Sequence, residues 1–133
     1  DGLNVRDWLH VEDHCRAIDG LLGTGTNGET YNIGGGNELT NLDLTHRILA
    51  LLKLPATMIR PVTDRLGHDR RYALDTRKLR LLGWRPRVDI STALGETVDW
   101  YRENEWWWRP LTATKVRPRG QLTEQQIKRL EDW

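Results

Sequence analysis

Apolar residues recur at helical spacing in an early part of the chain. The positions that form this pattern are Val11, Cys15, Ile18 and Leu22. Side chains at this spacing lie on one face of a helix, so the pattern predicts a helix over residues 12–22 that buries this face. Asp13 falls in the first turn, where a negative charge interacts favourably with the helix dipole. A short extended segment over residues 5–11 is expected to precede the helix.

Three further helices are expected downstream. One begins where Thr40 or Asn41 can cap it, and Pro55 bars its continuation. A short helix ends at Gly83, because glycine is a common helix terminator. The last strong helix begins after Asp89 and carries an apolar stripe on its buried face.

Two short β-prone runs, residues 30–33 and 58–62, are expected to be extended. Together with residues 5–11 they give only two or three strands, which are too few for a convincing independent sheet. The order of helices and extended runs fits an α/β protein whose missing strands would lie upstream of Asp1. The expected architecture is therefore a small mixed domain with few strands and about four or five helices.

The composition limits the classes of partner. The 133 residues include 20 Lys and Arg against 19 Asp and Glu, so the net charge of +1 gives no strong field toward nucleic acid or a membrane surface. No apolar run reaches membrane-spanning length. Cys15 is the single cysteine, which excludes an intrachain disulfide and suits a reducing cytoplasm. We therefore expect a cytoplasmic protein without nucleic-acid or membrane partners.

Two motifs suggest ligand sites but have simpler explanations. Gly23, Gly25 and Gly28 have the dinucleotide-binding spacing G-x-G-x-x-G. That site needs a strand before the glycines and a helix after them, and the predicted order here is reversed, so the segment is interpreted as a turn. His10 and His14 are four residues apart, but valine follows the first histidine where a zinc-protease helix needs glutamate. Structural histidines are expected there, and no metal site.

The carboxy-terminal part is rich in tryptophan and basic residues. Residues 106–108 are three consecutive tryptophans followed by Arg109, and such a segment could stack bases and hold phosphates. The balanced total charge instead favours packing against the final helix or at an interface. Residues 111–121 are expected to form a mobile extension, and Thr123 with Gln126 gives a capping-box signature for a short terminal helix.

Residues 64–71 form the densest charge cluster of the chain. Three arginines surround a glycine and a histidine, and these five residues are Arg65, Gly67, His68, Arg70 and Arg71. Guanidinium groups bind phosphate oxygens bidentately, and glycine lets the backbone approach a ligand closely, so anion binding is one interpretation. The other is a solvated charge run in which Asp64 and Asp69 pair with the arginines.

Three segments form a combined signature. They are Val5-Arg-Asp-Trp-Leu-His-Val-Glu-Asp-His14, Gly28-Glu-Thr-Tyr-Asn-Ile-Gly-Gly35 and Asp64-Arg-Leu-Gly-His-Asp-Arg-Arg-Tyr-Ala-Leu-Asp75. Together they resemble the dTDP-glucose 4,6-dehydratase family of the extended short-chain dehydrogenase/reductase superfamily. The run Gly-His-Asp-Arg-Arg-Tyr is the specific part, because related decarboxylases and epimerases usually lack it. Leu66 departs from the proline often found there, which changes the stiffness of the loop but removes no polar contact.

The resemblance implies an NAD-dependent lyase built on a Rossmann-type domain. In the family, NAD takes a hydride from the sugar C4, water is lost across C5 and C6, and the hydride returns to C6. The substrate dTDP-glucose thereby becomes dTDP-4-keto-6-deoxyglucose. Residues 1–110 would be the carboxy-terminal, substrate-binding portion of such an enzyme, and residues 111–133 an extension.

The resemblance also assigns residues to the substrate site. Arg6 and Asn41 would contact the diphosphate or the nucleoside. Arg65 and His68 would complete the nucleotide-diphosphate site, and they lie in a loop that also contains Asp64 and Gly67.

The catalytic and cofactor-binding residues of the family are not expected in this chain. Tyr31, Tyr72 and Tyr101 are followed four residues later by Gly, Thr and Glu, so none forms the family's Tyr-x-x-x-Lys pair. The glycine-rich fingerprint and the acidic dehydration residues would lie before Asp1, and NAD would be bound there. The family also implies a homodimer.

Two alternatives stay open at this point. One is a related UDP- or GDP-sugar epimerase, decarboxylase or dehydratase. The other, of a different class, is a non-enzymatic nucleotide- or RNA-binding module that uses the arginine-rich loop and the tryptophan-rich segment.

Overall fold

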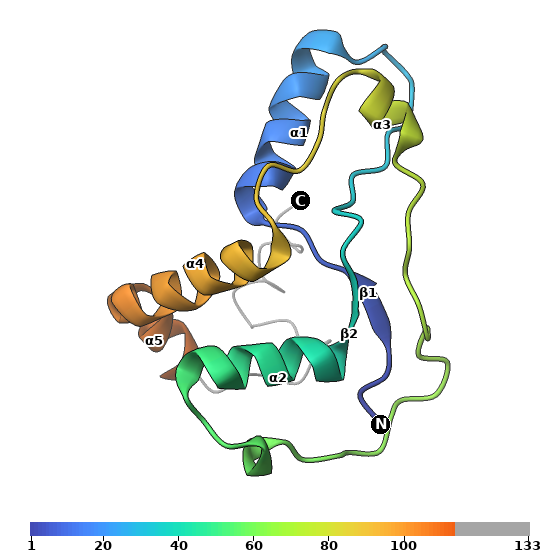
Figure 1. Cartoon of the computed structure of the whole chain (residues 1–133). Helices are drawn as coiled ribbons and strands as arrows, with labels where there is room; N and C mark the ends of the chain where they lie inside the picture. The colour runs from blue at the N-terminus through green and yellow to red at the C-terminus, as the bar shows by residue number, and fades with distance from the viewer. Residues whose placement is uncertain (114–133) are drawn as a thin grey trace, which may run out of the picture. The chain divides into compact units, whose positions relative to one another are not determined.

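The computed structural model describes residues 1–113 of the chain. The elements are β1 (Val5–Asp7), α1 (Val11–Thr24), β2 (Glu38–Thr40), α2 (Asn41–Leu52), the 3-10 helix η1 (Ala56–Met58), α3 (Arg77–Leu81), α4 (Ile90–Glu103) and α5 (Glu105–Ala113) (Figure 1). The chain divides into two compact units, of which the first is residues 1–100 and the second begins at Tyr101. The expectation of an α/β fold with about five helices is confirmed.

Two short strands form the sheet of the described residues. β1 and β2 pair antiparallel, with Val5 opposite Thr40. The other edge of β1 is also used, because Val5 and Arg71 form a parallel bridge. The amide of Val5 donates to the carbonyl of Arg70 at 2.8 Å, and the amide of Tyr72 donates to the carbonyl of Val5 at 3.1 Å. β1 therefore lies between β2 and the segment around residue 71, which places that segment beside the first residues of the chain.

The helix predicted over residues 12–22 is present as α1, but its apolar side is not the buried side. Its buried residues are Asp13 and Ala17, one turn apart. Val11 is 66% exposed and Leu22 is 84% exposed, so the expectation that this apolar face is buried is wrong within the described residues. The hydrogen bonds of Asp13 to another segment explain which side of the helix faces inward.

Asp13 joins α1 to the segment before α4. Its carboxylate accepts hydrogen bonds from the amides of Arg87, at 3.1 Å to each oxygen, and Val88, at 3.2 Å, and it pairs with the guanidinium of Arg16. Burial raises the pKa of Asp13, but these hydrogen bonds and the charge of Arg16 outweigh it and hold the pKa below its ordinary value. The carboxylate is therefore ionised and buried, with 1% of the residue exposed, and it connects α1 to the segment before α4.

The two β-prone runs, residues 30–33 and 58–62, do not form strands in the structure. Residues 30–33 lie outside any strand, and β2 comes instead immediately before α2. The carbonyl of Thr30 accepts from Lys78 of α3 at 2.8 Å, and the side chain of Asn32 donates to the carbonyl of Asp75 at 3.1 Å. Residues 58–62 also contain no strand, since η1 occupies the start of that run. A β-prone sequence forms a strand only where a neighbouring strand is available for pairing.

The predicted boundaries of α2 and α3 agree with the structure. The Thr40 hydroxyl accepts a hydrogen bond from the amide of Asp43 at 2.9 Å, which caps α2. Gly83, just beyond α3, has φ 89, a conformation that favours glycine. The buried apolar core is small, and each of its members comes from a different helix: Ala17, Leu44, Leu79 and Ala93.

The second unit contains the beginning of the tryptophan-rich segment. The indole of Trp108 donates to the carbonyl of Tyr101 at 2.7 Å, and the two rings are 6.4 Å apart. The helix predicted to begin after Asp89 is present as α4 and is interrupted before Glu105. A further helix, α5, follows; it contains Pro110 and ends at Ala113. Residues 111–113 of the expected extension are helical; residues 114–121 and the predicted terminal helix lie outside the described residues. Within residues 1–113, no helix has the length and apolar character needed to cross a membrane.

Candidate functional site

Arg6 lies on β1, and its guanidinium reaches the loop that contains His68. Its NH2 is 2.9 Å from the Nε2 atom of His68 and donates to the carbonyl of Asp69 at 3.0 Å. Its NH1 donates to the carbonyl of Val5 at 2.6 Å. These bonds use three of the five N–H donors of the guanidinium, so the described residues leave one N–H of NH1 and the N–H of Nε for other partners.

One tautomer of His68 satisfies both Arg6 and Asp64; the amide nitrogen of Asn4 also lies 3.4 Å from Nδ1, which in this tautomer does not accept from it. Arginine can only donate, so the Nε2 atom of His68 must accept from Arg6. The proton then lies on Nδ1, which donates to the carboxylate of Asp64 at 2.8 Å. His68 is therefore held between a cation and an anion, with its ring orientation fixed by both.

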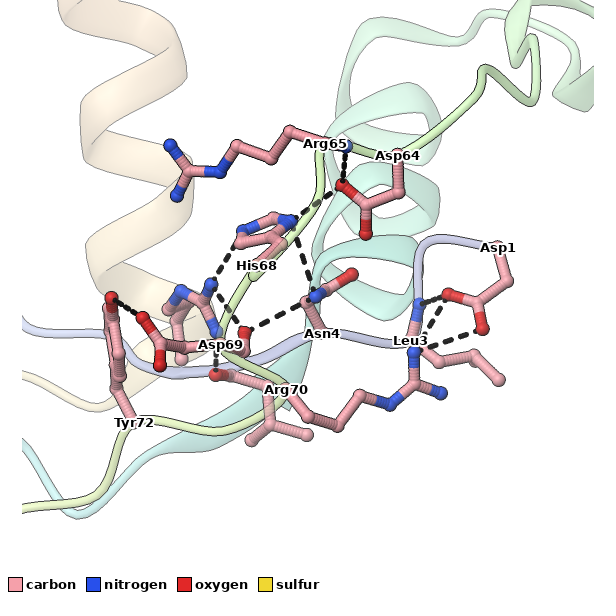
Figure 2. Close-up of polar contacts among 11 residues, drawn as sticks. Asp1, Leu3, Asn4, Asp64, Arg65, His68, Asp69, Arg70 and Tyr72 are labelled. Carbon is pink, nitrogen blue, oxygen red and sulfur yellow. Dashed lines mark hydrogen bonds and ion pairs between the residues drawn. The ribbon is translucent and has the colours of Figure 1, made fainter.

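Asp64 organises the loop in which it lies. The hydrogen bond from His68 lowers the pKa of Asp64; desolvation opposes this, and the weaker effect of the hydrogen bond from the amide of Arg65 lowers the pKa as well. The carboxylate accepts from the Arg65 amide at 2.8 Å as well as from His68 (Figure 2). Asp64 thus fixes both the backbone of the loop and the ring of His68.

Tyr72 and Asp69 complete the surroundings of Arg6. The guanidinium carbon of Arg6 lies 4.2 Å from the centre of the Tyr72 ring, within the range of a cation–π interaction. The Tyr72 hydroxyl donates to the carboxylate of Asp69 at 2.6 Å, and this bond raises the pKa of Tyr72. Tyr72 therefore remains a protonated donor at neutral pH, which keeps its ring in place.

Asn4 supports the same cluster from the side of β1. It lies two residues before Arg6 along an extended backbone, so the two side chains point to the same side. Asn4 is 5% exposed, and its amide nitrogen donates to the carbonyl of Asp69 at 3.3 Å. We call these joined residues the arginine–histidine cluster: Asn4, Arg6, Asp64, His68, Asp69 and Tyr72.

The other arginines of the charged run do not all remain available. Arg70 forms hydrogen bonds of 2.9 Å with both carboxylate oxygens of Asp1, and Arg71 pairs with Glu38 at 2.6 and 2.8 Å. The guanidinium of Arg65 has no carboxylate partner among residues 1–113, and Figure 2 shows its side chain extended above the ring of His68. The interpretation that Asp64 and Asp69 neutralise the arginines is wrong, because those carboxylates bind His68 and Tyr72.

Asn41 and Gly67 are near the cluster through the backbone. Asn41 is the first residue of α2, and its amide donates to the carbonyl of Asn4 at 2.9 Å. Gly67 has φ 68, so the turn between Arg65 and His68 uses a backbone conformation that favours glycine. The structure thus brings Arg6 and Asp64 into contact with His68, one on each nitrogen of its ring. No hydrogen bond within the described part of the chain joins the side chains of Asn41 and Arg65 to them.

The sequence analysis did not single out Asn4 or assign a binding role to Asp69 or Tyr72. A signal for Asn4 was present in the alternation of side chains along an extended segment, which puts residues 4 and 6 on one side. Asp69 lies in the charged run and Tyr72 directly follows it, but their contacts depend on Arg6, more than sixty residues away in the chain. Sequence spacing does not predict such a contact.

No described segment fits a dinucleotide cofactor or a metal. Gly23 lies in the last turn of α1, Gly25 and Gly28 follow the helix, and no helix begins before α2, so no helix amino terminus meets the glycines. The predicted turn is present at residues 27 and 28, whereas residues 23 and 24 are helical. No group of three or more His, Cys, Asp or Glu side chains within residues 1–113 is arranged to hold a metal ion. A shallow hollow of about 450 Å³ lies between α2 and α4, and no residue of the arginine–histidine cluster lines it.

Comparisons with known proteins show which proteins this chain is similar to. A dTDP-glucose 4,6-dehydratase of Streptomyces antibioticus is 53% identical over 121 residues, which are 90% of this chain and 35% of that protein. The crystal structure of a dTDP-glucose 4,6-dehydratase of Streptomyces venezuelae with NAD and TYD bound has a TM-score of 0.80 and 52% identity, over 84% of this chain and 35% of that one. The resemblance to dTDP-glucose 4,6-dehydratases is thus confirmed, and this chain spans about a third of the length of these relatives.

More distant structures share the fold. The UDP-glucose 4-epimerase of Thermotoga maritima, solved with UDP-glucose, is 33% identical with a TM-score of 0.68, over 77% of this chain and 33% of that one. A family model described as GDP-mannose 4,6 dehydratase matches residues 1–97, which is well over half of the chain. The chain therefore belongs to the GDP-mannose 4,6-dehydratase family.

Proposed function

We propose that this chain is the nucleotide-sugar-binding part of an NAD-dependent dTDP-glucose 4,6-dehydratase, a lyase that makes dTDP-4-keto-6-deoxyglucose. The observation that carries the proposal is the contact of 2.9 Å between Arg6 and His68, which joins two parts of the family signature. The relatives of about 50% identity, named dTDP-glucose 4,6-dehydratases, favour this activity over that of the UDP- and GDP-sugar enzymes. They also disfavour an unrelated RNA-binding module.

The arginine–histidine cluster would bind the diphosphate of the nucleotide sugar. Arg6 offers two N–H groups that the described residues do not use, one on NH1 and one on Nε, and each could donate to a separate oxygen of the diphosphate. Arg65 would add a second guanidinium, since it has no carboxylate partner within residues 1–113. Asp64 and Gly67 would set the shape of the loop and so place Arg65 and His68.

Asn41 would contribute from the amino terminus of α2. Its side-chain amide can donate and accept, which suits the nucleoside or an oxygen of the diphosphate. The hydrogen bond between its backbone and that of Asn4 sets its position relative to the cluster. The two residues therefore link α2 to β1 at the proposed site.

The chemical role of these residues would be binding and orientation. Contacts to the nucleotide diphosphate are remote from the sugar carbons, so they would hold the sugar where the reaction can proceed. The described residues do not fit NAD, and the chain has no Tyr-x-x-x-Lys pair, so we assign cofactor binding and acid–base chemistry to a part of the enzyme outside residues 1–113. NAD, when bound there, would supply the hydride acceptor. The proposed enzyme would be a cytoplasmic homodimer, as in the family that the sequence resembles.

Titration calorimetry on the full-length protein tests the proposal. We expect dTDP to bind at least tenfold more tightly than UDP or GDP, and Arg6→Ala to weaken the binding of dTDP. Arg77→Ala is a matched control, because Arg77 is an exposed arginine paired with Asp75 outside the cluster. Equal affinity for the three nucleotides would favour a related sugar-nucleotide enzyme, and unchanged affinity in Arg6→Ala would remove the cluster from the site.

A further inference from the structure

Arg6 is held on one face by an aromatic ring as well as by hydrogen bonds. The ring of Tyr72 lies 4.2 Å from its guanidinium carbon. Tyr72 is held at its backbone and at its hydroxyl. Its amide donates to the carbonyl of Val5 at 3.1 Å, and its hydroxyl donates to the carboxylate of Asp69 at 2.6 Å. Asp69 in turn accepts from Arg6 through its backbone carbonyl. The three residues therefore form a closed set of contacts.

We propose that Tyr72 is a positioning residue for Arg6, with its ring serving as a stacking surface that orients the guanidinium toward the diphosphate. This inference rests on the proposed function, since it assumes that Arg6 binds the ligand. It adds a residue that would act on affinity through Arg6 without touching the ligand. Asp69 would support it by fixing the ring through the hydroxyl.

The physical reason is the freedom of an arginine side chain. A long side chain loses rotational entropy when it binds a ligand, and a partner that restricts it beforehand reduces that loss. The quadrupole of an aromatic ring attracts a cation above its face, and arginine is the commonest cation in such pairs. The hydrogen bonds of Arg6 to Val5 and Asp69 fix two nitrogens, and the ring fixes the plane that contains them.

The first test replaces the ring. Tyr72→Leu and Tyr72→Met remove the aromatic face at a residue that is 49% exposed, so the fold should tolerate both. We expect each to weaken dTDP binding by about threefold to tenfold and to raise KM by the same factor, while kcat changes by less than about twofold. Tyr72→Phe keeps the face and should restore affinity to within about twofold of the original protein.

The matched control is another tyrosine with a cation above its ring. The Nζ of Lys78 lies 4.4 Å from the centre of the Tyr31 ring, and neither residue belongs to the arginine–histidine cluster. Tyr31→Leu therefore removes a similar interaction elsewhere in the same unit. We expect it to leave dTDP affinity and KM unchanged.

A double-mutant cycle decides whether Tyr72 acts through Arg6. In the Arg6→Ala background, Tyr72→Leu should weaken dTDP binding no further. An equal loss with and without Arg6 would overturn the inference, because Tyr72 would then act independently. Unchanged affinity in Tyr72→Leu and Tyr72→Met, with Arg6→Ala weakened, would also overturn it but leave the proposed function in place. Unchanged affinity in Arg6→Ala would overturn the proposed function itself.

Discussion

Arg6 and His68 are 62 residues apart in the chain, and the guanidinium NH2 lies 2.9 Å from the Nε2 atom of the imidazole. The contact joins the first strand to the charged loop. It also fixes the chemistry of the ring, because an atom that accepts from arginine carries no proton. His68 therefore presents a proton only at Nδ1, toward Asp64.

The first prediction concerns this tautomer. The ¹⁵N chemical shifts of the His68 ring at neutral pH should show a protonated Nδ1 and an unprotonated Nε2. Asp64→Ala removes the acceptor of Nδ1–H, but Arg6 still donates to Nε2, so the same tautomer should persist in this variant. His46, an exposed histidine of α2, is the control whose shifts should not change. Protonation of His68 at Nε2 alone would contradict the arrangement described above.

The second prediction concerns Arg65. Arg65→Ala in the full-length protein should weaken dTDP binding by about 1.5–3 kcal/mol, the range for a hydrogen bond to a charged group. The physical reason is that its guanidinium has no carboxylate partner within the described residues. Titration calorimetry measures the change, with Arg77→Ala as the control. Equal affinities in the original protein and in Arg65→Ala would exclude Arg65 from the binding site.

The third prediction concerns the buried carboxylate of Asp13. Asp13→Asn should lower the free energy of unfolding by about 2–3 kcal/mol at pH 7, because amides of another segment lose a charged acceptor. Urea unfolding measures this difference. Asp19→Asn, an exposed change on the same helix, is the control and should have little effect.

The pH dependence of stability provides a second measurement on Asp13. Its folded pKa lies below the ordinary value of 3.8, so its stabilising contribution is present above pH 3.8 and is lost as the pH falls through the folded pKa. The original protein should therefore lose more stability below pH 3.8 than Asp13→Asn does. Parallel pH profiles for the two proteins would show that the carboxylate does not stabilise the fold.

The fourth prediction compares two glycines. A Cβ at Gly35 would collide with the backbone carbonyl oxygen of Trp8, whereas a Cβ at Gly20, inside α1, would meet no atom within 4 Å. Gly35→Ala should destabilise the protein by about 1–3 kcal/mol through overpacking. Gly20→Ala should stabilise it by about 0.5–1 kcal/mol, because alanine favours the helix. Similar unfolding midpoints for the two variants would contradict the close approach at Gly35.

Elements with local signals could be predicted from the sequence. The start of α2 depends on the hydroxyl of Thr40 and the amide three residues later, and the end of α3 depends on Gly83. The helix cap and the helix termination both involve only neighbouring residues, so the residue types alone are sufficient to predict these helix ends. The helices were therefore found close to their true positions.

Features that depend on distant residues could not be predicted in this way. The buried side of α1 is decided by the bonds of Asp13 to Arg87 and Val88, more than seventy residues later. The position of β2 depends on pairing with β1, and the β-prone residues 30–33 have no such partner among the described residues. Apolar spacing and β-propensity carry no information on either contact.

The candidate site shows the same division. The residue types of the charged run suggested anion binding, and the family resemblance assigned Arg6, Asn41, Arg65 and His68 to the site. Residue type did not indicate that Arg70 and Arg71 are neutralised by Asp1 and Glu38, because each pair joins separate parts of the chain. These pairings follow from the folded backbone.

The parallel bridge between Val5 and Arg71 determines how the charged loop can move. The end of the loop is hydrogen-bonded to Val5 of β1 through the backbone of residues 70 and 72. The loop therefore cannot move away from the strand as a hinged lid without breaking those bonds. A displacement that keeps these bonds would move the loop together with the strand that carries Arg6. Strand and loop are thus mechanically coupled.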